Sequence, residues 1–299
     1  MSEAFVPSDA VREALRDGRP VVALETSVLA QGLPYPQNVE ALGLMTRAIR
    51  ARGAEPAWVF VKSGAIQVGA SEADLTSLAT TGNAVKVARR DLPMVIANGH
   101  LGATTVSATL WAAARAGVEV TATGGIGGVH VGSGDVSADL LELARSPGTL
   151  VCSVPKSIVD PVATLERIEE LGIGVLGYRC QRLPFFLVRE TDIRLEHFAA
   201  SPDEAAAASR TRRELGIASA LLVCNPIPTD YAMDAVAVTD AVQGCIRRAE
   251  TQGVKGKELT PFLLSCLAEK TGGASLEANL ALLESNAALA ADIAVALTA

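Results

Sequence analysis

The chain contains the stretch Gly148-Thr-Leu-Val-Cys-Ser-Val-Pro-Lys-Ser-Ile-Val-Asp160, which has the pattern of a strand, a stop and a lysine ahead of the next helix. Residues 150–152 are apolar without alternation, which is typical of a strand covered on both faces of a sheet. Pro155 ends this strand, and Asp160-Pro161 marks the start of a helix. Lys156 therefore follows the carboxyl end of a central strand, where open α/β sheets hold their ligands.

Lys156 is the first candidate for chemistry. An amine at the mouth of such a crevice is partly removed from water, which favours the neutral form that attacks a sugar aldehyde or its cyclic form. The alternative is a solvated loop lysine without a chemical role. The segment alone leaves both interpretations open.

Helical and strand patterns alternate along the rest of the chain, and no linker or low-complexity segment divides it. We therefore expect one α/β domain over residues 1–299, with helices on both faces of a mostly parallel sheet. Lys62-Ser63-Gly64 lies between two apolar runs and signals a hairpin, which predicts a mixed sheet or a small side lobe. The expected strands are 21–24, 58–61, 65–68, 94–97, 118–122, 175–176, 185–188 and 220–224. The expected helices are 8–17, 37–52, 72–78, 103–116, 137–144, 202–215, 240–251, 260–271 and 275–297.

Composition narrows the class of protein. The net charge of −7 argues against a broad nucleic-acid surface, although it does not exclude a small anionic ligand. No run approaches a membrane span, and the N-terminus lacks the pattern of a signal peptide. The five cysteines are an odd number without CxxC spacing, and Cys152 and Cys224 sit in apolar strand runs. We expect these two to be reduced core residues of a cytoplasmic protein.

Two further candidates lie at strand and helix ends. Glu25 closes an apolar strand, where partial removal from water suits a carboxylate to general acid or base catalysis. The alternative for Glu25 is to cap a turn or to pair with an arginine. Gly102-Ala-Thr-Thr-Val106 is expected to open a helix, whose free N–H groups and hydroxyls suit a phosphate. Threonines also open helices for capping alone.

Lys86 lies in a run with three cations in five residues, which would usually be a solvated surface. It alternates with Val85 and Val87, so it can instead project from a strand into the crevice while Arg89 or Arg90 meets an acid elsewhere. A second cation near Lys156 would favour the neutral form of that amine.

A glycine-rich run, Thr123-Gly-Gly-Ile-Gly-Gly-Val-His130, follows the strand over 118–122. It lacks the GxGxxG spacing and the later acidic residue of a dinucleotide site. Its glycines allow either close approach to a ligand or a tight turn. Downstream, Asp135 and Asp139 can share a helix face and suit Mg²⁺ or Mn²⁺, although Asp135 or Ser137 could simply cap the helix.

Together these segments resemble the pseudouridine-5′-phosphate glycosidase family, also called the indigoidine synthase A-like family. The resemblance covers nearly the whole chain. It is carried by Pro20-Val-Val-Ala-Leu-Glu25, Pro34-Tyr-Pro-Gln-Asn38, Lys86-Val-Ala-Arg-Arg-Asp-Leu-Pro93, Gly102-Ala-Thr-Thr-Val106, Ala122-Thr-Gly-Gly-Ile-Gly-Gly-Val-His130, Ser137-Ala-Asp-Leu140, Lys156-Ser157, Asn225-Pro-Ile-Pro228, Gly256-Lys-Glu258, Thr260-Pro-Phe-Leu-Leu264 and Ser275-Leu-Glu-Ala-Asn279.

The resemblance implies a three-layer α/β/α sandwich with a mostly parallel, mixed sheet, usually assembled as a homotrimer. It implies an enzyme that reversibly joins a uracil-type base to ribose 5-phosphate through a C–C bond. By position, Lys156 is the nucleophile, Glu25 the proton donor and Asp135 the ligand of Mn²⁺ or another divalent cation. The expected substrate contacts are Lys86, Thr105, Val106, His130, Ser137, Ala138, Asp139 and, for the base, Asn279.

The sequence departs from the family pattern around the expected pocket. Gln31 stands where the family has histidine, Ala88 where it has serine, and Ser153-Val154-Pro155 where it has small residues. The usual Glu-Ser-Thr is Glu25-Thr26-Ser27. The catalytic lysine and glutamate remain, so these departures concern the choice of base. Two alternatives follow: a C-glycosynthase that couples ribose 5-phosphate to another heterocycle for a C-nucleoside antibiotic, and a non-catalytic sugar-phosphate-binding protein.

Overall fold

The computed structural model of the chain describes residues 4–131 and 134–299. Its strands are β1 (Phe5–Pro7), β2 (Val21–Glu25), β3 (Glu55–Lys62), β4 (Ala65–Val68), β5 (Val85–Val87), β6 (Gly102–Thr104), β7 (Val120–Ala122), β8 (Thr149–Cys152), β9 (Gly174–Tyr178), β10 (Phe198–Ala199) and β11 (Leu221–Cys224). Its α-helices are α1 (Asp9–Arg16), α2 (Gln37–Arg50), α3 (Glu72–Thr80), α4 (Leu92–Ala97), α5 (Val106–Ala116), α6 (Ala138–Leu143), α7 (Pro161–Glu170), α8 (Pro202–Glu214), α9 (Ala235–Thr251), α10 (Leu259–Lys270) and α11 (Ala274–Thr298).

The strands form one mixed sheet in the order β1-β4-β3-β2-β7-β8-β11-β9-β10, with β6 pairing to β3 and β5 pairing to β6. From β3 through β10 along this order every neighbouring pair is parallel. The antiparallel pairs are β3 with β4 and β3 with β6. The predicted hairpin is therefore confirmed, and so is the mostly parallel, mixed sheet.

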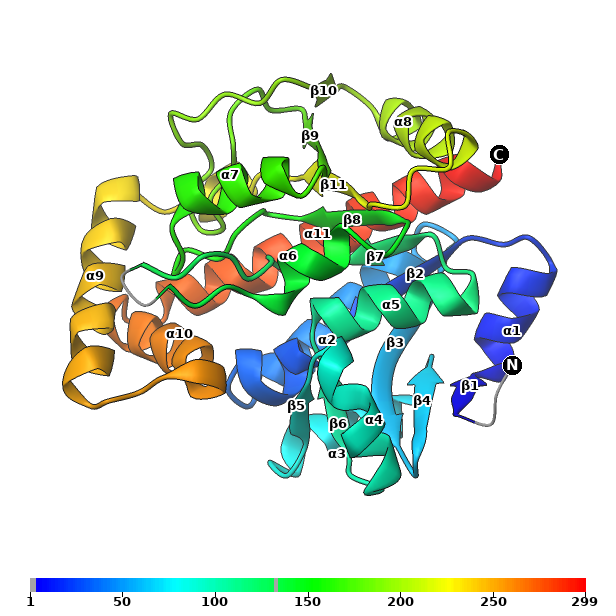
Figure 1. Cartoon of the computed structure of the whole chain (residues 1–299), viewed down its shortest axis with the longest axis horizontal. Helices are drawn as coiled ribbons and strands as arrows, with labels where there is room; N and C mark the ends of the chain where they lie inside the picture. Colours follow the sequence, from blue (N-terminus) through cyan, green and yellow to red (C-terminus); the bar gives the residue numbers. More distant parts are fainter. Residues whose placement is uncertain (1–3, 132–133) are drawn as a thin grey trace.

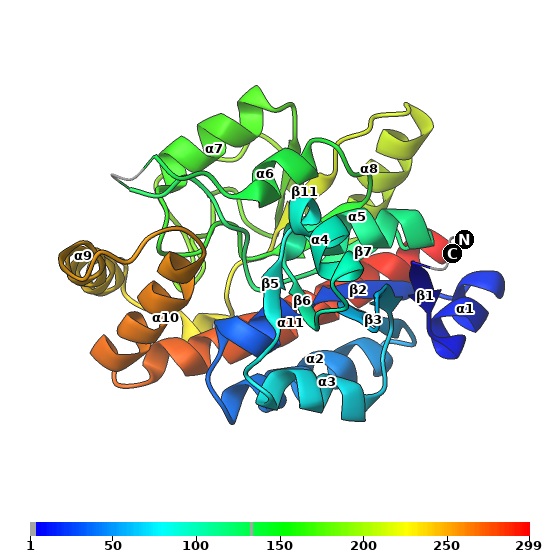
Figure 2. The same cartoon turned by 60° about the horizontal axis from the view of Figure 1, so that its bottom comes forward.

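Both faces of the central strands are buried, as their unbroken apolar runs predict. Val22 and Leu24 pack into the core beneath α2 and α11, whereas Val21 and Ala23 point to the opposite face, against α1 and α5. The side chains of strand β8 likewise alternate between these two faces of the sheet. Figure 1 shows α11 running along the sheet, and Figure 2 shows α2 and α3 on one side of the strands with α5 and α6 on the other. These layers confirm the α/β/α sandwich.

Helix α11 corrects one expectation, because its 25 residues contain an 18-residue segment with a mean hydropathy of 1.6 and could cross a membrane by length and composition. In the structure α11 packs against α2, α8, β7 and β8. Residues such as Leu282, Ala287 and Ile293 are completely buried there. Its apolar composition is therefore that of a core helix.

Three predicted elements are wrong. Residues 94–97 belong to helix α4 rather than a strand, since Pro93 suits a helix start and Leu92 and Val95 are buried at helical spacing. Residues 102–104 form strand β6 rather than the start of a helix, because they pair with both β3 and β5. Phe185 and Val188 exchange two backbone hydrogen bonds of 2.9 Å, so residues 185–188 form a tight turn instead of a strand.

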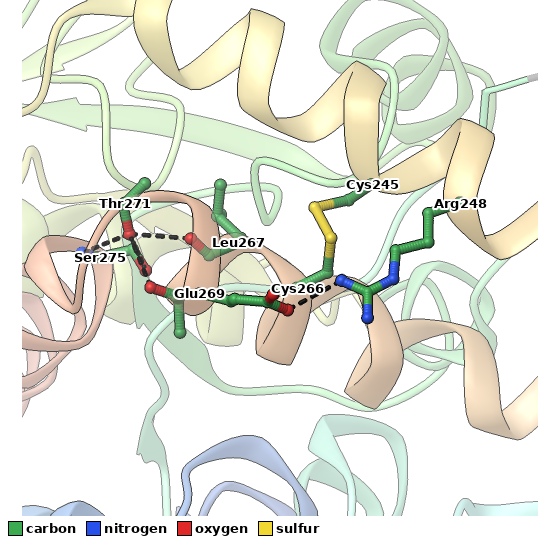
Figure 3. The surroundings of a disulfide bond; sticks show 8 residues. Cys245, Arg248, Cys266, Leu267, Glu269, Thr271 and Ser275 are labelled. Atoms are coloured by element: carbon green, nitrogen blue, oxygen red, sulfur yellow. Dashed lines mark hydrogen bonds and ion pairs between the residues drawn. A yellow bond between two sulfur atoms is a disulfide. The ribbon is translucent and has the colours of Figure 1, made fainter.

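The cysteines divide into two groups. Cys152 and Cys224 are free and completely buried, as predicted. Cys245 of α9 and Cys266 of α10 form a disulfide, which no spacing motif in the sequence indicates (Figure 3). Helices α9 and α10 lie together at the end of the molecule opposite α1 (Figure 1). The disulfide therefore ties together a pair of helices at one end of the fold.

Candidate active site

The parallel central strands bring their carboxyl ends to one edge of the sheet. β2 ends at Glu25, β7 leads into Thr123 and the glycine run, and β8 leads into the loop that carries Lys156. A cavity of about 270 Å³ opens at this edge. The predicted site residues that line it are Glu25, Lys86, Thr105, His130, Asp135, Ser137, Ala138, Asp139, Lys156 and Asn279.

Val106 is the predicted contact that does not line this cavity. Its side chain is 1% exposed and packs in the core with Leu110 and Leu140. A contact between Val106 and a ligand would therefore involve its main chain at the start of α5.

The loop that carries Lys156 is held by the glycine run. The Lys156 backbone N–H donates to the carbonyl of Ile126 at 3.0 Å, and the Ile126 N–H donates to the carbonyl of Val154 at 3.1 Å. Val154 is completely buried with φ of 59°, in the left-handed region that β-branched residues avoid. Such backbone strain persists only where the surroundings impose it, and it often marks a functional site.

The glycines of this run are required by packing against the protein. A Cβ at Gly125 would lie 2.7 Å from the Val154 carbonyl oxygen, and one at Gly127 would lie 2.4 Å from Ser137 Oγ. A Cβ at Gly124 would lie 3.2 Å from side-chain methyl groups of Leu282 and Leu283 of α11, which is tighter than most such contacts. Small residues thus allow the segments carrying the catalytic candidates to come close together.

Glu25 is held by two hydroxyl groups. Its side chain is 4% exposed, Ser27 Oγ donates to Oε2 at 2.6 Å, and Thr123 Oγ1 donates to Oε1. The described part of the chain provides no arginine partner for this carboxylate. Glu25 is therefore oriented at the cavity wall by hydroxyl groups, one of them from the turn that follows β2, and it forms no ion pair among the described residues.

Lys86 and His130 give the cavity its electrostatic character. Burial lowers the pKa of Lys86, the nearby ammonium of Lys156 lowers it further, and Asp139, Glu25 and Glu258 act in the opposite sense. Within residues 4–131 and 134–299, Lys86 forms no hydrogen bond or ion pair through its ammonium group. Burial also lowers the pKa of His130, which Asp135 partly opposes. Two lysines that share a partly desolvated cavity favour an anionic ligand.

Thr105 adds a hydroxyl to the same wall. It is the N-cap of α5, yet its side chain makes no capping hydrogen bond, and its buried Oγ1 lacks a partner among the described residues. A buried hydroxyl without a partner costs free energy, so this group is suited to a ligand such as a phosphate at the helix start.

Asp139 and Ser137 organise the adjoining backbone. Asp139 Oδ1 accepts from the Ser107 N–H and Oδ2 from the Gly127 N–H, each at 3.0 Å. Ser137 caps α6 by accepting from the Asp139 N–H at 3.2 Å. Arg89, as expected, pairs with an acid elsewhere, donating to Glu142 at 2.9 Å.

Asp135 is exposed at the cavity mouth. Among the described residues no cluster of three or more His, Cys, Asp or Glu side chains could enclose a metal ion. A single carboxylate fits a hard cation that keeps most of its waters and shares a phosphate of the ligand.

Sequence reasoning missed two parts of the site. Asn286, completely buried in α11, donates to the carbonyls of Thr123 at 2.8 Å and Gly124 at 3.2 Å, and lies 3.2 Å from Ser153 Oγ. Asn225 donates to Asn286 Oδ1 at 2.9 Å, so one polar network supports both catalytic loops. Thr260, Pro261 and Leu264 of α10 form another cavity wall, and only the motifs that contain them were visible in the sequence.

The chain belongs to the family described as Indigoidine synthase A like protein, which matches residues 10–296. It is 43% identical over 289 residues to a pseudouridine-5′-phosphate glycosidase of Staphylococcus aureus, covering 96% of this chain and 94% of the relative. It is 45% identical over 296 residues to a pseudouridine-5′-phosphate glycosidase of Symbiobacterium thermophilum, covering 97% and 96%. The resemblance seen in the sequence is therefore confirmed.

Two solved structures share the whole fold. One is the prealnumycin C-glycosynthase AlnA in complex with ribulose 5-phosphate, with a TM-score of 0.91, 33% identity, and coverage of 100% of this chain and 98% of that one. The other is an indigoidine synthase A-like protein of Thermotoga maritima, with a TM-score of 0.90, 38% identity, and coverage of 99% and 97%.

Proposed function

We propose that the chain is a pseudouridine-5′-phosphate glycosidase, which reversibly cleaves the C–C bond between uracil and ribose 5-phosphate. The observation that carries this proposal is the meeting of Lys156 and Glu25 in one cavity with Lys86, whose ammonium has no ion-pair partner among the described residues. Relatives of that name at 43–45% identity over nearly the full chain support it.

The geometry suits chemistry that ordinary glycosidases do not use. A C–C glycosidic bond has no leaving heteroatom to protonate, so a pair of carboxylates alone does not suffice. Glu25 gives its proton to the ring oxygen as the Lys156 amine bonds to C1′, and the C1′–O bond breaks to open the ribose. The nitrogen, now an ammonium, gives a proton back to Glu25, and its lone pair then forms an iminium at C1′ as the bond to the base breaks. That electron pair passes into the base, whose carbon takes up a proton, and water releases ribose 5-phosphate from Lys156.

The remaining residues hold the substrate in this reaction. Lys86 and the Thr105 hydroxyl bind the phosphate, and Asn279 faces the base from α11. Asp139 holds the start of α5 and the glycine run in place. Holding the substrate in a fixed position beside the catalytic residues lowers the entropic part of the activation barrier.

Product analysis tests the proposal. The chain is incubated with pseudouridine 5′-phosphate, and separately with ribose 5-phosphate and a panel of heterocycles, and the products are identified by mass. Release of uracil and ribose 5-phosphate, lost in Lys156→Ala and Glu25→Gln but kept in Lys62→Arg, is the expected result. Lys62 is a matched control because it is a surface lysine paired with Asp74.

The C-glycosynthase alternative is favoured by one observation, the similarity to AlnA together with Gln31 in the cavity wall. Under that alternative, coupling to another heterocycle is much faster than pseudouridine 5′-phosphate cleavage. Binding of ribose 5-phosphate without any product would instead identify a non-catalytic binding protein.

A divalent cation, with Mn²⁺ preferred, is part of the proposal. Asp135 would hold it together with waters and the substrate phosphate, where it offsets negative charge. We expect excess chelator to lower activity, and Mn²⁺ to restore it. Asp135→Asn should weaken the dependence on added Mn²⁺. Full activity in chelator would exclude the metal from the account.

A homotrimer is also part of the proposal and rests on the family resemblance. Light scattering coupled to size-exclusion chromatography measures the mass directly. A mass near three times 30.9 kDa is expected.

A further inference from the structure

Gln31 lies in the cavity wall close to the proposed catalytic acid. It belongs to a π-helical turn, η1 (Val28–Gly32), which follows Glu25 at the end of β2. Its side chain lines the same cavity as Lys156 and Lys86. A neutral amide at this position cannot act as a general acid or base, but it can donate and accept hydrogen bonds.

Hydrogen bonding fixes the orientation of the Gln31 amide. Nε2 donates to the carbonyl of Ala84, just before β5, at 2.8 Å. A carbonyl oxygen can only accept, so the NH₂ group must face Ala84 and Oε1 must face the other way. Oε1 is buried, and no donor in the described part of the chain reaches it.

A buried acceptor without a donor loses its hydrogen bond to water and gains none in the protein, so the fold gains nothing from this oxygen by itself. We infer that Gln31 is a specificity-determining residue, whose Oε1 accepts a hydrogen bond from an N–H of the base or an O–H of the sugar. The inference rests on the proposed function for the identity of the ligand. It adds a requirement that the ligand carry a donor at this point.

The chemistry of the ligand limits where the donor can be. A phosphate dianion offers only acceptors, so it would be repelled by Oε1 and belongs with Lys86 and Thr105. Uracil joined through carbon keeps both ring N–H groups free, and each of them is a donor. A sugar hydroxyl is the other source of a donor.

Paired substrate and protein variants test the inference. The kcat/KM for cleavage is measured with pseudouridine 5′-phosphate, its N1-methyl and N3-methyl forms, and its 2′-deoxy and 3′-deoxy forms, for the native chain and Gln31→Met. Methionine matches the length of glutamine without an acceptor amide, so a steric penalty of a methyl group persists in both proteins. Unfolding temperatures control for the loss of the bond to Ala84. Affinities for the same compounds are measured in the Lys156→Ala background, where no turnover occurs.

In the native chain, we expect the kcat/KM of one analogue to be about 100-fold or more below that of pseudouridine 5′-phosphate. In Gln31→Met, the loss for the same analogue should be smaller by at least about tenfold. The analogue that responds identifies the donor as base or sugar. Equal losses in both proteins for every analogue would overturn the inference. If the native chain binds pseudouridine 5′-phosphate without cleaving it, the proposed function fails, and the affinities still decide the role of Gln31. If it binds none of these compounds, both proposals fail.

Discussion

At the scale of single residues, the site retains groups that the fold does not need. Among the described residues, the ammonium of Lys86 has no ion-pair partner and the buried hydroxyl of Thr105 has no hydrogen bond. The backbone of Val154 is in the left-handed region. Each of these features destabilises the protein when no ligand is present. Natural proteins keep such costs where activity requires them.

Substitution of Lys86 measures how much this residue lowers the free energy of unfolding. Replacing Lys86 with methionine removes a partly buried cation next to Lys156 and keeps an aliphatic side chain of similar length. We expect the free energy of unfolding to rise by about 0.5–2 kcal/mol, as for other stabilising substitutions. The affinity for ribose 5-phosphate should fall about 10–100-fold, because a charge-assisted hydrogen bond is lost. Denaturant unfolding and calorimetric binding measure the two effects, and a variant that is both less stable and unchanged in affinity would contradict this role.

His130 determines part of the pH dependence of stability. Burial lowers its pKa in the folded state, so below the ordinary value of about 6.5 the unfolded chain binds more protons at this position. Its contribution to stability is therefore complete above that pH and is lost as the pH falls through the window below it. We expect the unfolding temperature of the native chain to drop more than that of His130→Gln between about pH 6.5 and 5. Parallel curves for the two proteins would show that His130 does not titrate in this way.

At the scale of elements, loops and helices from distant parts of the chain form the cavity. Asn286 of α11 joins the glycine run to the loop after β8. Ile158 and Val159, which follow Lys156, pack against Cys245 of α9 and Leu263 of α10. The position of α10, which forms one wall of the cavity, thus depends on its packing against α9.

The disulfide between Cys245 and Cys266 should stabilise this attachment. It links residues 21 positions apart, and a loop of that length restricts the unfolded chain by about 3 kcal/mol. We expect reduction to lower the unfolding temperature. Cys245→Ala and Cys266→Ala should each do the same, while the double variant loses little more, because both substitutions break one bond. Cys180→Ala is the control, since that buried cysteine is free. An unfolding temperature that stays the same after reduction would contradict the expectation.

At the scale of the whole molecule, the apolar runs of β2 and β8 were enough to predict a sheet covered on both faces. Local pattern failed where tertiary pairing decides the conformation. Gly102-Ala-Thr104 has the small residues of a helix start, yet β3 and β5 draw it into the sheet. Residues 185–188 are apolar because they pack into the core as a turn rather than as a strand. The pairing of Cys245 with Cys266 depends on how α9 packs on α10, which no spacing motif conveys.

The site was predictable where side chains follow strands. Glu25 ends β2 and Lys156 follows β8, two strands that run parallel on either side of β7, so their meeting at one edge follows from the sheet, and the family motifs identify the remaining contacts. The network around Asn286 and the Oε1 of Gln31, which no described donor reaches, could not be predicted, because both depend on which carbonyl groups lie nearby in three dimensions.

The central claim is that Lys156 bonds covalently to C1′ of the sugar. Borohydride reduction of an imine makes such a bond permanent, so the chain is treated with ribose 5-phosphate and borohydride, digested, and mapped by mass spectrometry. The account predicts one reduced sugar-phosphate adduct, on the peptide containing Lys156, absent in Lys156→Ala and retained in Lys62→Arg. An adduct on Lys86 or another lysine, or none while cleavage proceeds, would contradict the claim.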